Sequence, residues 1–136
     1  MTVSNKANPF LWMGLFLMGL ALGSCSTFSK GEPKGPLRSQ QAGKYIGKTK
    51  TVCGVVATSL YDEKGPGQPT FLNLDRPFPD HFFTIVIWGP ERHKFSEPPE
   101  KTFQGKRVCA TGEITTHDGK PQIAVHEPSQ ITIESD

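Results

Sequence analysis

The sequence predicts an all-β domain that carries one short helical segment. Short stretches rich in β-branched and aromatic side chains recur along the second half of the chain. Segments rich in glycine, proline and aspartate separate them, as expected of turns between strands. No stretch beyond residue 44 has the 3.6-residue apolar period of a long helix. We therefore expect a single β domain at residues 44–136.

The first expected strand, Lys50–Tyr61, is long and rich in valine and threonine. Gly54 lies in its middle, where we expect a bend or a bulge because glycine weakens a strand interior. The segment Asp62–Gln68 that follows has the composition of a turn.

Two further strands follow that turn. Pro69–Leu74 alternates two leucines on one face with Phe71 and Asn73 on the other. Phe82–Trp88 is the most apolar stretch after the N-terminal segment, which is typical of a central strand. The segment between them, Asp75–His81, contains two prolines and interrupts the pairing.

The last elements are a helical turn and two strands. Gly89–Pro99 has a proline near the start of a possible helical turn and no longer helical period, so we expect a short helix. The strands Lys106–Thr115 and Gln122–His126 are joined by Thr116–Lys120, which contains an Asp-Gly hairpin turn. The tail Pro128–Ile133 adds at most a short edge strand.

This order of elements resembles the OB-fold of nucleic-acid-binding type, a five-stranded Greek-key barrel with one short helix between its third and fourth strands. The resemblance lies in Gly105–Ile114 followed by Gly119–Ile123, in Pro69–Leu74 followed by Phe83–Trp88, and in the closing segment Pro128–Ile131. It implies a binding face on the second and third strands and their flanking loops. It does not name the ligand, because the same barrel binds oligonucleotides, oligosaccharides and proteins.

The N-terminal segment resembles a bacterial lipoprotein signal. Lys6 precedes the apolar run Pro9–Leu22, which closes on Leu22-Gly23-Ser24-Cys25. The resemblance implies cleavage after residue 24, lipidation and acylation of Cys25, and anchoring in the membrane. Two alternatives remain open: ordinary signal cleavage with Cys25 incidental, or an uncleaved N-terminal anchor. All three place the rest of the chain outside the cytoplasm.

We expect three parts: a signal peptide at 1–24, the lipidated cysteine with a flexible tether at 25–43, and the OB-type domain at 44–136. The tether is rich in serine, glycine, proline and lysine. Ser26 follows the cysteine, and the lipoprotein resemblance then implies an outer-membrane protein facing the periplasm if the cell is Gram-negative. Residues 44–136 carry 8 lysines and 3 arginines against 12 acidic residues, so the positive balance lies in the signal and tether.

After Cys25 only Cys53 and Cys109 remain, an even pair in a chain expected to be exported. A disulfide between them closes a loop of about 57 residues, for which chain entropy predicts about 4 kcal/mol of stabilisation. The OB resemblance implies that they lie on adjacent strands. The alternative is two buried free thiols.

No catalytic constellation is evident, and we expect a protein that is not an enzyme and needs no cofactor. The histidines at 81, 93, 117 and 126 are dispersed, and we expect them to be solvated. Four carboxylates flank the second strand, but charged turns are commoner than metal sites, so we expect no metal there: Asp62, Glu63, Asp75 and Asp80.

The predicted binding surface is the outer side of the second and third strands. If the leucines of Pro69–Leu74 point inward, Phe71, Phe82 and Trp88 form an aromatic platform with cations nearby. In the alternative, these rings pack under Asp75–His81 or against the helix. The predicted ligand-binding residues are Lys64, Phe71, Asn73, Arg76, Phe82 and Trp88.

Two functions follow from these features. The aromatic surface and the OB resemblance favour a monomeric module that binds single-stranded nucleic acid outside the cytoplasm. The near-neutral charge of residues 44–136 and the envelope location favour an interaction protein that binds another protein, a glycan or a small ligand.

Overall fold

The computed structural model describes residues 31–135, and a compact unit begins at Glu32. The predicted signal peptide, Cys25 and the first residues of the predicted tether lie outside the described residues. Within residues 31–135, no helix has the length and apolar character needed to cross a membrane.

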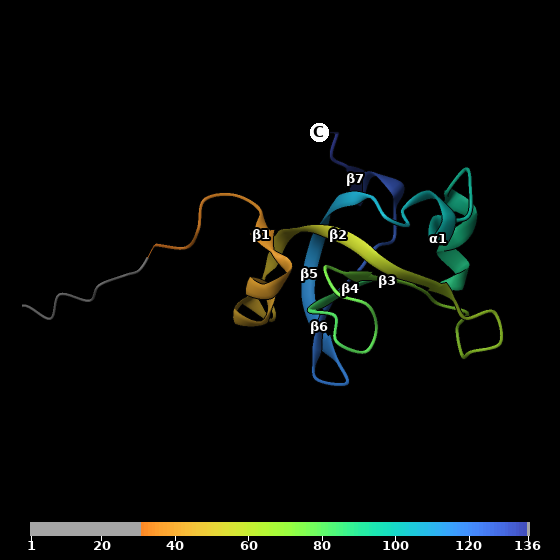
Figure 1. The fold of residues 1–136 in the computed structure, drawn as a ribbon, viewed down its shortest axis with the longest axis horizontal. Helices are drawn as coiled ribbons and strands as arrows, with labels where there is room; N and C mark the ends of the chain where they lie inside the picture. Colours follow the sequence, from red (N-terminus) through yellow and green to blue (C-terminus); the bar gives the residue numbers. More distant parts are fainter. Residues whose placement is uncertain (1–30, 136) are drawn as a thin grey trace, which may run out of the picture. The chain divides into compact units, whose positions relative to one another are not determined.

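The described part of the chain is all-β, with seven strands and only short helical segments (Figure 1). The strands are β1 (Leu37–Arg38), β2 (Thr49–Tyr61), β3 (Thr70–Leu74), β4 (Phe83–Ile87), β5 (Arg107–His117), β6 (Lys120–Ala124) and β7 (Ile131–Ile133). The helical segments are η2 (Ser39–Tyr45), η3 (Gly89–Lys94), α1 (Pro99–Thr102) and η4 (Pro128–Gln130). The five predicted strands correspond to β2 to β6, β7 is the short edge strand expected in Pro128–Ile133, and β1 is an additional short strand.

The strand order is β1-β2-β3-β4-β6-β5-β7, and β2 also pairs with β5. The pairings of the five longer strands therefore return to β2 and form a closed circuit. Within it β4 and β6 are parallel, whereas the other neighbours are antiparallel. Figure 1 shows β2 crossing β5 and continuing alongside β3.

Strand β2 is long because it serves two partners. Its first half, up to Val55, pairs with β5, and its second half, from Val56, pairs with β3. The irregularity expected at Gly54 lies slightly later, between Val56 and Thr58. Gly54 has a different role: a Cβ there would lie 2.6 Å from a carboxylate oxygen of Asp75. Glycine is needed for this close approach.

The core lies on the inner face of the strands and follows the predicted alternation. The buried apolar cluster includes every second residue of β3 and β4, as well as residues of the other strands. Its members are Leu37, Ala42, Val52, Val56, Leu72, Leu74, Phe83, Ile85, Ile87, Phe103, Val108, Ala110, Ile114, Ile123, Val125 and Ile131. The inward orientation predicted for the leucines of β3 is thus confirmed.

The folded part begins earlier than predicted. Leu37 pairs with Val52 through β1 and is buried in the core, and Ala42 of η2 is fully buried. The start predicted at Lys44 is therefore too late. Leu37 and Ala42 stand isolated in a segment with the polar composition of a tether, so no apolar period predicted that they are part of the core.

One short helix was predicted between the third and fourth strands, and the structure has two, η3 and α1. Arg92 of η3 connects this region to the sheet, because its guanidinium lies 3.6 Å from the ring centroid of Tyr61 and donates a hydrogen bond to Thr70. It also forms an ion pair with Glu100 of α1 at 2.7 Å. Arg92 therefore holds the helical segments against β2 and β3.

Cys53 and Cys109 form a disulfide, as predicted. They are directly opposite each other in the antiparallel pairing of β2 with β5. Directly opposed residues of antiparallel strands bring their Cβ atoms close enough for such a bond. The disulfide therefore covalently links the two strands whose pairing closes the circuit.

Candidate functional site

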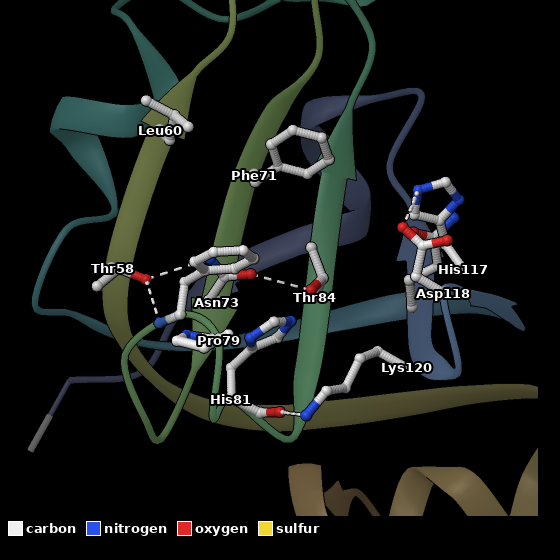
Figure 2. A pocket seen from close by; sticks show the side chains of 12 residues that line it. Thr58, Leu60, Phe71, Asn73, Pro79, His81, Thr84, His117, Asp118 and Lys120 are labelled. Atoms are coloured by element: carbon white, nitrogen blue, oxygen red, sulfur yellow. Dashed lines mark hydrogen bonds and ion pairs between the residues drawn. The ribbon is translucent and has the colours of Figure 1, made fainter.

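A cavity of about 510 Å³ lies on the outer face of β2, β3 and β4 (Figure 2). The loop between β3 and β4 borders one side, and the turn between β5 and β6 borders another. Its volume is within the range of pockets that hold small ligands or parts of larger ones. The lining residues are Thr58, Leu60, Phe71, Asn73, Phe78, Pro79, His81, Thr84, His117, Asp118, Lys120 and Gln122.

The floor of the cavity is a row of three polar side chains on neighbouring strands. Thr58 and Thr84 are each paired with Asn73, on its two sides. The Thr84 hydroxyl donates to Asn73 Oδ1 at 2.9 Å, and Asn73 Nδ2 donates to the Thr58 hydroxyl oxygen at 3.1 Å (Figure 2). Because these groups satisfy one another, they form a defined polar floor rather than a set of free side chains.

The loop over this floor is held at its base by Asp75. Its carboxylate accepts a hydrogen bond from the backbone N–H of Val55 at 2.9 Å and another from the Ser39 hydroxyl. Its own backbone N–H donates to the carbonyl of Val55 at 2.7 Å. The residue has a positive φ of 68°, a conformation that aspartate tolerates better than most residues. Asp75 therefore fixes where the loop turns back over β3 and β4.

His81 closes one end of the cavity. The residue is only 6% exposed, and its ring stacks on that of Phe78 with centroids 5.7 Å apart. The ammonium of Lys120 donates to the backbone carbonyl of His81 at 2.8 Å, which ties the loop to the β5–β6 hairpin (Figure 2). Burial lowers the pKa of His81, with a further lowering by Lys120 that Asp80 partly opposes. The imidazole is therefore neutral at neutral pH.

The rim of the cavity is both apolar and charged. Phe78 is 70% exposed, so it offers an apolar surface at the rim. On the other side, the Asp118-Gly119 turn places His117 and Asp118 at the rim (Figure 2). Both turn residues have positive φ, as in the tight hairpin turn that the sequence predicted. The arrangement suits a flat group that stacks on an aromatic ring.

The structure brings together only some of the predicted binding residues. Phe71 and Asn73 line the cavity. Phe82 lies elsewhere, with the guanidinium of Arg76 4.6 Å from its ring centroid. Trp88, which is 38% exposed, packs against the 62–68 turn, where a Cβ on Gly67 would come within 2.9 Å of the indole.

Lys64 is exposed in that same turn and does not line the cavity. The platform of three aromatic rings is therefore not assembled, because Phe82 and Trp88 lie just before and just after β4, at opposite ends of an extended strand.

Sequence reasoning missed the loop residues of the site. His81 was expected to be solvated, which is wrong, and Phe78 was not considered. The loop folds back over Asn73 and Thr84, so its side chains complete the cavity. The signal in the sequence was the pair of rings, Phe78 and His81, in a loop that joins the two strands of the predicted binding face.

Among residues 31–135, one group of three potential metal ligands lies close enough to share an ion: Cys53, Cys109 and Glu134. Both cysteines are in the disulfide, so neither offers a thiolate. The carboxylate of Asp75, one of the four considered as metal ligands, is engaged by Val55 and Ser39 instead.

No protein family model matches the sequence, and no curated protein matches it. Among solved structures, an OBody, AM1L10, bound to hen egg-white lysozyme has 16% identity and a TM-score of 0.48, over 78% of this chain and 99% of that one. The asparaginyl-tRNA synthetase of Entamoeba histolytica has 19% identity and a TM-score of 0.47, over 77% of this chain and 25% of that one. The aspartyl-tRNA synthetase of the same organism has 16% identity and a TM-score of 0.45, over 76% and 23%. This chain thus spans about a quarter of each synthetase. We therefore argue the ligand of the cavity from the residues that line it.

Proposed function

We propose that this chain is an exported, membrane-anchored OB-type module that binds single-stranded nucleic acid at the cavity on β3 and β4. The observation that carries the proposal is the cavity itself: Phe71 and Phe78 offer aromatic surfaces beside a polar floor. Exposed aromatic rings stack on nucleobases, whatever their sequence. The closed circuit of β2 to β6, with its parallel β4–β6 pair, supports the OB-type architecture.

Charge sets how the nucleic acid is held. Residues 31–135 have 13 basic and 12 acidic side chains, and several of the basic ones are already in ion pairs. The domain therefore lacks the excess of basic residues typical of proteins that bind the phosphate backbone. Lys120 lines the cavity and is the lysine that could contact a phosphate there. We expect stacking to supply most of the affinity, with a shallow dependence of log affinity on log salt, about −1 to −2.

Replacing Phe71 with alanine is expected to weaken the binding of a single-stranded oligonucleotide about 5- to 150-fold, because each base stacked on an aromatic ring contributes about 1–3 kcal/mol. Trp88→Ala is the matched control, since it removes a partly exposed ring outside the cavity. Anisotropy of a fluorescently labelled oligonucleotide, titrated with the full chain in detergent at two salt concentrations, measures both. An equal loss in the two variants would place the contact elsewhere on the surface.

A second candidate is an envelope partner such as a protein, a glycan or a small ligand. The near-neutral charge of the domain and the mostly apolar wall of the cavity favour it. This candidate predicts no binding of oligonucleotides at any salt concentration. It predicts instead a salt-insensitive complex with one envelope component that Phe71→Ala abolishes.

The membrane anchor is tested separately at Cys25. Changing Cys25 to serine is expected to abolish incorporation of radiolabelled palmitate and to release the chain from the membrane fraction, because two or more acyl chains are what hold it there. The double variant Cys53→Ala/Cys109→Ala keeps Cys25 and should still be labelled. Membrane retention of Cys25→Ser at unchanged mass would indicate an uncleaved apolar anchor instead.

A further inference from the structure

Within residues 31–135, the Nδ1 atom of His81 is the one buried side-chain nitrogen or oxygen that has no hydrogen-bond partner. Folded proteins leave few such atoms, because an unpaired buried polar group costs about 1–3 kcal/mol. His81 lines the cavity, but its Nδ1 atom is covered when no ligand is present. A partner that enters the cavity therefore reaches this atom only when the loop that carries His81 shifts.

The groups around His81 do not supply that partner. The ring of Phe78, stacked on the imidazole, has no donor for it. The ammonium of Lys120 donates to the backbone carbonyl of His81 and not to its ring. Asp80 is exposed and does not line the cavity, and His117 and Asp118, which do line it, are exposed at the rim.

We propose that Nδ1 of His81 accepts a hydrogen bond from the exocyclic amino group of a nucleobase, cytosine or adenine, that stacks in the cavity. This inference rests on the proposed function and adds to it a preference for bases that carry an exocyclic amino group. The imidazole is neutral because burial and Lys120 lower its pKa, so one ring nitrogen is free to accept. The proposal assigns the proton of the neutral ring to Nε2, which leaves Nδ1 as the acceptor.

The geometry discriminates between bases by their donors. An amino group facing Nδ1 makes a hydrogen bond, whereas a carbonyl oxygen in the same place leaves two buried acceptors facing each other. Sites built around such a polar group reject the analogue that cannot pair with it. Cytosine carries an amino group where uracil has a carbonyl, and its adjacent ring nitrogen N3 is an acceptor where uracil has an N–H. Adenine and hypoxanthine differ in the same way at C6 and N1.

The test compares fluorescein-labelled oligomers of deoxycytidine and deoxyuridine, of equal length, titrated at pH 7.5 with the full chain in detergent and followed by anisotropy. We expect deoxycytidine to bind about tenfold more tightly. In His81→Phe, which keeps a stacking ring and removes the nitrogen, this ratio should fall to about one. His93→Phe, at an exposed histidine that does not line the cavity, should keep the ratio.

A stability measurement separates this role from a structural one. Because His81→Phe removes a buried nitrogen that has no partner, we expect its melting temperature without ligand to rise by about 5 °C. If the imidazole instead holds the loop in place, the melting temperature should fall and the inference is overturned. The rise also shows that the variant folds, so that its binding ratio can be interpreted.

Acidification provides a further readout on the unaltered chain. Protonation of His81 removes the acceptor, so the preference for deoxycytidine should decline as the pH falls below the ordinary histidine range. Lys120 and Asp80 act on the pKa of His81, and His117 and Asp118 line the same cavity, so the pH profile of His81→Phe measures the contribution of these four groups.

The outcomes distinguish the two proposals. If neither oligomer binds, the proposed function fails and this inference fails with it. If both bind equally to the unaltered chain, or if the ratio persists in His81→Phe, the inference fails and the proposed function stands.

Discussion

Replacing Cys53 and Cys109 together by alanine is expected to lower the free energy of unfolding by about 4 kcal/mol, because the disulfide closes a long loop and restricts the unfolded chain. For a domain of this size, such a loss lowers the melting temperature by on the order of 15 °C or more. Thermal or chemical unfolding of the double variant, compared with the unaltered chain, measures it.

The same two strands offer the control. Thr51 and Thr111 are also directly opposite each other in the β2–β5 pairing, and their hydroxyl oxygens are 2.7 Å apart. Replacing both by valine removes a non-covalent cross-strand contact, and we expect a change of at most about 1 kcal/mol. Reducing agent should destabilise the unaltered chain and leave the alanine variant unchanged. A melting temperature that does not respond to reductant would contradict the role assigned to the disulfide.

Replacing Phe83 with alanine is expected to cost about 3–5 kcal/mol, because its side chain is fully buried in the core and its removal leaves a cavity. Its neighbour Phe82 is the matched control. Phe82 is half-buried on the opposite face of the strand, where Arg76 lies over its ring, so Phe82→Ala should cost about 1 kcal/mol.

Urea unfolding of both variants measures this difference and tests the register of β4. A shift of one residue would exchange the two side chains between the core and the outer face. Equal losses, or a larger loss for Phe82→Ala, would therefore contradict the register that also places Thr84 on the floor of the cavity.

The alternation of apolar residues was sufficient to predict the strands and their inner face. In β3 the two leucines, and in β4 Phe83 and its alternate neighbours, belong to the core cluster as the period of two requires. The residues between them in β4, Thr84 and Val86, are also buried, so burial alone does not alternate in this strand. The hairpin at Asp118-Gly119 was likewise predictable, because few residues other than aspartate, asparagine and glycine accept positive φ in a two-residue turn. These are local signals, each contained in a few consecutive residues.

The candidate site was only partly predictable. Phe71 and Asn73 were identified from their positions on the outer face of β3, and both line the cavity. His81 and Phe78 were not, because a proline-rich loop has no period that shows which way its side chains point. Phe82 and Trp88, which share the predicted face with Phe71, lie at the two ends of β4, and neither lines the cavity.

By itself, the sequence determined the all-β class, the five main strands, their inner face and the one pair of cysteines available to join them. These features depend on the alternation of side chains and on the conformational limits of turn residues, which act over short distances along the chain. Only the tertiary structure decided that Leu37 and Ala42 complete the core, and that the loop after β3 folds over Asn73 to bury His81. Burial depends on what the rest of the chain places next to a residue, and its neighbours in sequence do not carry that information.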